Sequence, residues 1–181
     1  MKFYLTSLLV LCICCASLFS CVEEQDFTQY DDINVTPTAE ASILYIEAPE
    51  SAINAAGDAD VISRNFNFDA FSSDVFAERV LDGSVTYIVE NTTSKDVTIR
   101  IELIGEVGNV LDIVIIDVDA MMPRQVTEIF YGSAARPINL IKETSSIRVT
   151  ATNRGDNSST SDLPDPKIIL KSSGKFRLQL K

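Results

Sequence analysis

The sequence contains no histidine and no tryptophan. Without histidine, the chain has no imidazole base, no Ser-His-Asp or Cys-His arrangement and no histidine ligand for zinc. Without tryptophan, it lacks the side chain most often found stacking on sugars or anchoring an interface. We therefore expect no catalytic residue and no cofactor, and an enzyme is the least favoured class of function.

An apolar run follows Lys2 at the N-terminus and ends in residues 18–21, LFSC. The run covers residues 3–19, which is at the short limit for a membrane span and long enough for a signal peptide. The four-residue sequence resembles the lipobox of bacterial lipoproteins, in which a signal peptidase cuts before an acylated cysteine. The resemblance implies a signal peptide over residues 1–20, lipidation of Cys21 and recognition of the three preceding residues, Leu18, Phe19 and Ser20. An uncleaved N-terminal anchor helix is the alternative.

Cleavage before Cys21 removes the other three cysteines, Cys12, Cys14 and Cys15. The mature chain then keeps one cysteine whose sulfur is bound to lipid, so we expect no disulfide, no catalytic thiol and no cysteine–metal cluster. Two or more acyl chains hold a protein firmly at a membrane, since each buried methylene contributes about 0.8 kcal/mol.

The residues after Cys21 indicate to which membrane such a lipoprotein would be sorted. Val22 stands where an aspartate would signal retention in the inner membrane, so the resemblance to lipoproteins implies sorting to the outer membrane. The acids that follow look like the surface-export signal of Bacteroidota-type lipoproteins: Glu23, Glu24 and Asp26. We expect a lipid-anchored outer-membrane protein, with surface export and a plain solvated linker both open as interpretations of these acids.

The formal net charge is -11, and the acidity is concentrated near the N-terminus. Residues 22–63 contain ten acidic and no basic side chains, whereas residues 64–181 contain sixteen acidic and fourteen basic ones. A nucleic-acid partner requires a basic face that releases counterions, so we expect none. We assign residues 21–41 as an acidic tether and residues 42–181 as one domain, because the length leaves room for a single core.

Hydrophobic alternation is the strongest signal beyond the tether. Apolar and polar side chains alternate over residues 97–103, which is the pattern of a half-buried strand. Similar runs predict nine strands, at residues 42–47, 62–71, 84–91, 96–105, 110–118, 125–131, 146–153, 167–171 and 175–181. Short strands separated by turn residues are typical of an antiparallel β-sandwich.

Three local patterns refine this all-β prediction. Residues 172–174, Ser-Ser-Gly, predict a hairpin loop with glycine at the left-handed position. The final strand alternates basic and apolar residues, and its basic face is suited to protecting a sheet edge. Ser73 is placed to cap one short helix that ends at Gly83 and carries four apolar residues, Val75, Phe76, Val80 and Leu81.

A looser resemblance covers residues 87–130, YIVENTTSKDVTIRIELIGEVGNVLDIVIIDVDAMMPRQVTEIF. A strand that ends in an Asn-Thr-Thr turn, followed by an alternating strand and a Gly-Asn turn, is similar to the immunoglobulin-like sandwich modules of bacterial envelope proteins. The cysteine pair and core tryptophan of true immunoglobulin domains are absent. The mature chain also resembles small Bacteroidota lipoproteins, and this resemblance implies a cellular location but no activity. The two resemblances together imply an immunoglobulin-like β-sandwich.

Three aspartates lie around the very apolar residues 111–118 of a predicted strand: Asp112, Asp117 and Asp119. Asp117 and Asp119 are two residues apart, so in a strand both carboxylates face one side, where oxygen ligands could hold calcium. No EF-hand loop is present. The favoured interpretation is that these acids mark the solvent face and the end of the strand, and calcium binding is the weaker alternative.

Two other segments are distinctive. Four phenylalanines fall within eleven residues, and they predict a local core cluster under the helix or, less favoured, an apolar docking patch: Phe66, Phe68, Phe71 and Phe76. Residues 156–165, DNSSTSDLPD, are the longest polar stretch and predict a mobile loop without residues of special chemistry.

The leading hypothesis for function is a non-catalytic interaction or accessory subunit of an outer-membrane assembly. Its expected partners are the membrane, through the N-terminal lipid, and another envelope protein. The alternative is a surface module that binds a glycan or calcium, and an enzyme ranks third.

Overall fold

The structure is a computed structural model of the chain, and it describes residues 34–56, 60–68, 70–71, 73–133 and 135–180. The predicted signal peptide, the lipidated Cys21 and the acids of the export signal lie outside the described residues. The described part has its own hydrophobic core between two sheets.

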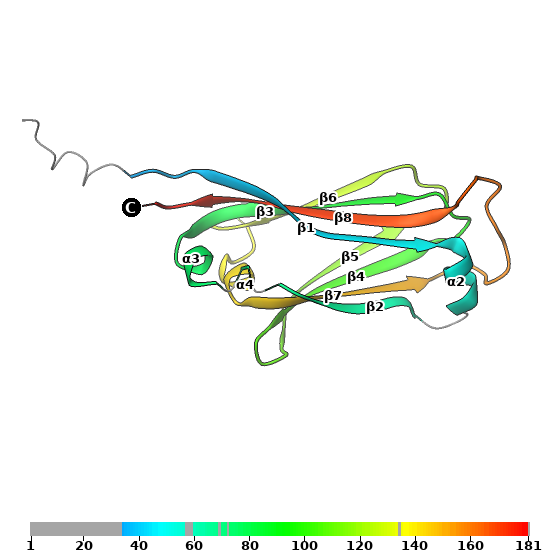
Figure 1. Ribbon diagram of the computed structural model, residues 1–181, viewed down its shortest axis with the longest axis horizontal. Helices are drawn as coiled ribbons and strands as arrows, with labels where there is room; N and C mark the ends of the chain where they lie inside the picture. The colour runs from blue at the N-terminus through cyan, green and yellow to red at the C-terminus, as the bar shows by residue number, and fades with distance from the viewer. Residues whose placement is uncertain (1–33, 57–59, 69, 72, 134, 181) are drawn as a thin grey trace, which may run out of the picture. The chain divides into compact units, whose positions relative to one another are not determined.

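Two four-stranded antiparallel sheets face each other (Figure 1). The first sheet contains, in spatial order, β1 (Thr38–Pro49), β8 (Lys167–Leu178), β3 (Val80–Asn91) and β6 (Gln125–Tyr131). The second contains β2 (Asp60–Asn67), β7 (Thr144–Asn153), β4 (Val97–Gly105) and β5 (Val110–Val118). The predicted antiparallel β-sandwich is confirmed.

The strand order assigns the sandwich a jelly-roll connectivity. Of the eight described strands, only β4 and β5 are consecutive neighbours in one sheet, and every other connection passes from one sheet to the other. This is the arrangement of an eight-stranded jelly roll with two Greek keys. An immunoglobulin domain instead pairs its first two strands in one sheet, so the resemblance over residues 87–130 reflects the sandwich and not the order of its strands.

Strand alternation fills the core as the sequence predicts. In β4, Val97, Ile99 and Ile101 are buried, while Thr98 and Arg100 between them are partly exposed. The same alternation in β3 and β8 sends one set of side chains into the core and leaves the other set on the outer face of the first sheet.

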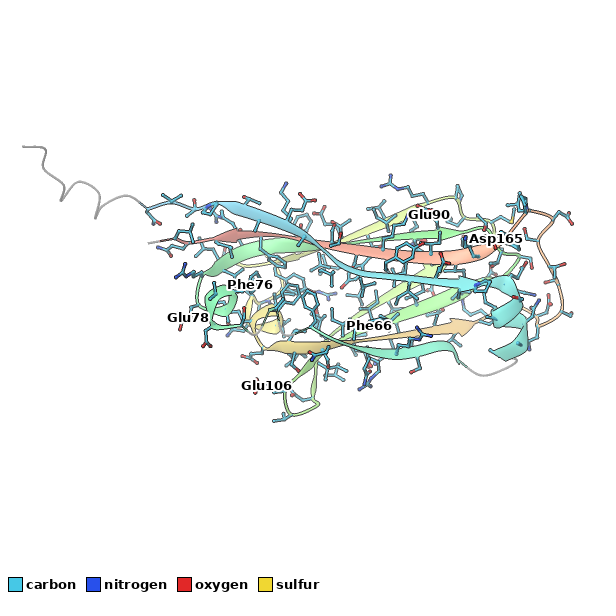
Figure 2. The ribbon with its side chains drawn as sticks, in the orientation of Figure 1. Phe66, Phe76, Glu78, Glu90, Glu106 and Asp165 are labelled. Atoms are coloured by element: carbon cyan, nitrogen blue, oxygen red, sulfur yellow. The ribbon has the colours of Figure 1, made fainter. Side chains whose placement is uncertain are left out.

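The phenylalanine cluster is part of this core, as the favoured interpretation predicted. Phe71 is buried, and its ring centroid lies 4.5 Å from that of Phe68 and 5.3 Å from that of Phe76. Figure 2 shows Phe66 and Phe76 between the two sheets. Phe176 of β8 joins the cluster at 5.3 Å from Phe71, a contact that the sequence did not predict.

The predicted hairpin at residues 172–174 is wrong, because β8 runs without interruption through it. Gly174 pairs with Val85 on one side and Ala41 on the other, and it does not adopt a left-handed conformation. A Cβ at Gly174 would lie 2.6 Å from the Phe176 ring and 3.2 Å from Ile43. Glycine is therefore needed here to admit these core side chains, not to make a turn.

The edge role predicted for the C-terminal strand is also wrong. β8 lies between β1 and β3, so its basic residues Lys175 and Arg177 stand on the outer face in the middle of a sheet. Among the described strands, the edges are β1 and β6 in the first sheet and β2 and β5 in the second.

Three short helices lie in the described residues: α2 (Glu50–Ala56), α3 (Asp74–Ala77) and α4 (Asn139–Lys142). The predicted helix exists only as α3, and Val80 and Gly83 belong to β3. Ser73 does not cap α3 through its side chain, since its hydroxyl donates to the Ala70 carbonyl at 2.9 Å. The sequence did not predict α2 or α4. Each of the three is too short to cross a lipid bilayer.

The domain begins earlier than the predicted boundary at residue 42. β1 starts at Thr38, which pairs with Arg177 of β8, and Val35 forms an isolated bridge with Leu180. The last residues assigned to the acidic tether are therefore part of the sheet.

Candidate functional site

The three aspartates considered as calcium ligands do not converge. Asp117 is exposed on β5 and accepts a hydrogen bond from the Thr98 hydroxyl at 2.6 Å, and Asp119 is exposed just beyond the strand. These two acids mark the solvent face and the end of the strand, as predicted. In the part of the chain that the structure describes, no three acidic, histidine or cysteine side chains are placed to hold a metal ion.

Asp112 departs from that prediction because it faces the other sheet. Its carboxylate accepts hydrogen bonds from the hydroxyl of buried Tyr131, at 2.9 Å, and from the Arg136 guanidinium, at 2.6 Å. Burial, together with nearby Tyr87 and Asp112, raises the pKa of the Tyr131 phenol and keeps it a donor. The three groups satisfy one another and link β5 to β6, so they stabilise the sandwich.

A second polar cluster closes the end of the sandwich that carries α2 (Figure 1). Lys95 is fully buried, and its ammonium donates to Asp156 at 3.0 Å and to the Ser159 hydroxyl at 2.6 Å. Hydrogen bonds from the N–H groups of Ser159 and Ser158 lower the pKa of Asp156. The stretch predicted as a mobile loop has no helix or strand, but this network ties it to the sandwich.

Glu50, the first residue of α2, anchors the same stretch from the other side. It is 2% exposed, and its carboxylate accepts hydrogen bonds from the N–H and hydroxyl of Ser94, both at 2.7 Å, and from the N–H of Ser161 at 2.8 Å. Burial disfavours the charged form, but these hydrogen bonds outweigh it and lower the pKa of Glu50. The cluster is structural, since its charges are paired or hydrogen-bonded within the protein.

On the outer face of the second sheet, several polar side chains form hydrogen bonds with one another. Glu102 accepts hydrogen bonds from Arg100 at 2.8 Å and Arg148 at 3.0 Å, and Arg148 also donates to Asn65 at 3.1 Å. Three large apolar side chains on this sheet are exposed, all on its edge strand β5: Val110, Ile113 and Ile115.

We call the outer face of the first sheet the β3–β8 face, after its central strands. Three large apolar side chains on it are more than half exposed: Tyr45, Val126 and Phe130. The strand register places Tyr45 of β1, Lys171 of β8, Ile88 of β3 and Val126 of β6 in one row across the sheet. We call these four residues the Tyr45 row.

An open groove of about 630 Å³ lies at one end of the β3–β8 face, and we call it the β6 groove. Its lining includes Ser84 of β3, Glu128 and Phe130 of β6, and Lys175 of β8. Gly132 follows β6 with a φ of 135°, and a Cβ there would lie 2.6 Å from the Asp82 Cβ. Glycine at this position therefore lets the chain turn closely past β3 and shapes the groove.

A second hollow, of about 360 Å³, opens toward the α2 end of the same face. Glu90, Ile169 and Lys167 line it from the sheet, and Leu163 and Asp165 line it from the connection that precedes β8. Figure 2 shows Glu90 and Asp165 at this end. Both hollows thus lie on the β3–β8 face.

Sequence reasoning did not find the β6 groove. Three of its lining residues, Ser84, Phe130 and Lys175, are separated by up to ninety-one positions, and only the pairing of Ser84 with the other two brings them side by side. Each of the three lies in a sequence that is ordinary for a strand, so no local pattern identifies it as part of a binding groove.

No family model matches the chain, and no curated protein matches it. Solved structures with some likeness include the VP2 subviral particle of infectious bursal disease virus, at 14% identity and a TM-score of 0.36 over 82% of this chain. A Parabacteroides distasonis protein provisionally described as secreted is 12% identical, with a TM-score of 0.40 over 77% of this chain. The chain spans 33% and 37% of those two proteins. Desmodium yellow mottle tymovirus is 5% identical, with a TM-score of 0.35 over 82% of this chain and 89% of the viral one.

Proposed function

We propose that the protein is a lipid-anchored, non-catalytic interaction subunit of an outer-membrane assembly, and that it contacts an envelope protein through the Tyr45 row. The observation that carries the proposal is that the Tyr45 row crosses the β3–β8 face from edge to edge, on the same face as two hollows. The second sheet also exposes apolar side chains, Ile113 and Ile115, but these lie along the single strand β5 and do not cross the sheet.

The composition of the Tyr45 row suits a protein partner. Protein interfaces are rich in tyrosine and aliphatic contact at the centre and polar at the rim. Around the row, Lys171 pairs with Glu90 at 3.3 Å, and the Tyr45 hydroxyl donates to Glu47 at 2.8 Å. These exposed pairs are of the kind that contributes little to stability and remains available to a partner.

The N-terminal sequence supports the placement of the domain at a membrane. The apolar leader, the lipobox at residues 18–21 and the acids after Cys21 together match the lipoprotein pattern. A triacylated Cys21 would hold the chain at the membrane without a spanning helix. Replacement of Cys21 by alanine should release or mislocalise the protein, and unchanged membrane attachment would favour an uncleaved anchor.

The groove chemistry supports a non-catalytic role. A glycosidase needs two carboxyl groups roughly 5 to 9.5 Å apart, one of which carries a proton. Asp82 and Glu128 both line the β6 groove, but their backbone positions are about 13 Å apart along the strands, since Glu128 lies opposite Thr86, four residues from Asp82 on β3. Asp82 is also paired with the Arg177 guanidinium.

Site-directed photo-cross-linking in intact cells tests the proposal. A photoreactive residue replaces Ile88, in the Tyr45 row, and the matched control carries it at Thr150, which faces outward from a central strand of the other sheet. We expect one stoichiometric envelope protein to be captured from position 88 and not from position 150. A second variant, Tyr45→Ser, should reduce its co-purification. Recovery of the protein alone, or equal capture from both positions, would refute the docking role.

A further inference from the structure

The β6 groove carries polar side chains that the protein itself does not satisfy. Ser84 is 5% exposed, and its hydroxyl makes no hydrogen bond to any residue that the structure describes. Ser84 sits between Phe130 on β6 and Lys175 on β8, its direct partners in the register. Neither Lys175 nor Glu128 forms an ion pair with another described residue. A nearly buried hydroxyl, an ammonium, a carboxylate and an exposed aromatic ring therefore converge on one hollow.

This inventory excludes several classes of ligand. A wholly apolar ligand would cover Ser84 and leave its hydroxyl unpaired, at a cost of about 1–3 kcal/mol. A strongly charged ligand would find no net charge of the opposite sign, because Glu128 and Lys175 offset each other and Asp82 is paired with Arg177. An added peptide strand would pair along the outer edge of β6, whereas Ser84 and Lys175 belong to central strands whose backbone is already paired on both sides.

We propose that the β6 groove binds a neutral saccharide. A sugar ring presents hydroxyl groups that both donate and accept hydrogen bonds, and it also has an apolar face of C–H groups. Phe130 offers the ring on which that face can stack, Glu128 accepts hydrogen bonds from hydroxyls, and Lys175 donates to them. Ser84 can do both. The volume of about 630 Å³ is within the range of small-molecule sites, roughly 300 to 1,000 Å³.

Saccharide binding goes beyond the proposed docking role, because the groove and the Tyr45 row are separate parts of the β3–β8 face. On β3, Ser84 in the groove and Ile88 in the row are four residues apart, or about 13 Å. Loss of one function therefore need not remove the other.

The test is binding of the full chain, purified in detergent, to immobilised oligomers of glucose, mannose, galactose and xylose, with oligomers of uronic acids alongside. We expect at least one neutral oligomer to bind and to raise the melting temperature at millimolar concentration. For that oligomer, Phe130→Ala should weaken binding about tenfold or more, and Glu128→Gln and Lys175→Met should each weaken it measurably. Ile115→Ala, a similarly exposed change on β5 of the other sheet, is the matched control.

Each remaining outcome overturns the proposal. No binding of any neutral oligomer at millimolar concentration removes the saccharide site, and binding of uronic-acid oligomers alone makes the ligand an anion. Binding that survives Phe130→Ala, in a variant that melts like the parent, places the ligand elsewhere. Cross-linking from position 88 is measured in the same variants, so a failed saccharide site and a failed docking role are separately visible.

Discussion

Replacement of Glu50 by glutamine perturbs the polar cluster at the α2 end with the smallest change of shape. The carboxylate accepts hydrogen bonds on both oxygens, two from Ser94 and one from the N–H of Ser161. A glutamine keeps one accepting oxygen and turns the other position into an NH₂ donor. In either orientation of the amide, at least one donor then faces another donor.

The expected loss follows from these contacts. A hydrogen bond to a charged group contributes about 1.5–3 kcal/mol, and a buried donor left unpaired costs about 1–3 kcal/mol. Glu50 is 2% exposed, so water cannot readily replace the lost acceptor. If the amide oxygen stays with Ser94, only the bond to Ser161 is lost, and we expect the free energy of unfolding to fall by about 2 kcal/mol.

Urea denaturation measures that fall, with the slope of the transition expected to stay unchanged. Amide hydrogen exchange gives the local readout, since the Ser161 N–H should exchange faster while core amides of β4 change only with global stability. Glu78→Gln, at an exposed position after α3, removes the same charge and is the control. A loss below about 0.5 kcal/mol, the range of neutral surface changes, would refute the view that Glu50 anchors the stretch before β8.

Three further outcomes are expected. Ser172→Ala should raise the free energy of unfolding by about 1 kcal/mol, because the Ser172 hydroxyl is buried without a partner among the residues that the structure describes, and Ser173→Ala on the outer face should be neutral by the same denaturation. Asp112→Asn should lower it by about 1–2 kcal/mol, because the bond from Arg136 loses its charge, and a neutral result would remove the proposed link between β5 and β6. Because folding lowers the pKa of Glu50, its contribution is complete above the ordinary glutamate pKa and is lost as pH falls through the folded pKa. The stability difference between the parent and the Glu50→Gln variant should therefore shrink on acidification, and a constant difference would contradict this.

The sandwich could be predicted from the sequence because each strand has its own local pattern of alternating apolar and polar residues. Alternation in β4 and β5 requires only the side chains of each strand, and the predicted bounds of β5 and β6 match the observed ones. Turn signals were less reliable. Gly174 has the local context of a hairpin, and only the approach of Phe176 and Ile43 shows why a glycine lies inside a strand.

The strand order could not be predicted, because it depends on pairings between distant residues. Thr38 pairs with Arg177, and Asp60 pairs with Thr152. No periodicity in either partner identifies the other. The same reason explains why the C-terminal strand was misplaced at an edge, since its basic alternation is compatible with any strand that has one solvated face.

Whether a polar residue is structural or available for binding depends on the partners that the fold supplies. Two serines of this chain illustrate this dependence. Ser84 and Ser94 lie on either side of the largely apolar stretch 85–89, and both are at least partly buried. The fold gives the Ser94 hydroxyl the carboxylate of Glu50, so that side chain contributes to stability. Among the described residues it gives the Ser84 hydroxyl no partner, and it places Ser84 between Phe130 and Lys175 in an open groove. The Ser84 hydroxyl is therefore left to water or to a ligand in the β6 groove, and a ligand that bonds to it gains from a group that the fold has not already used.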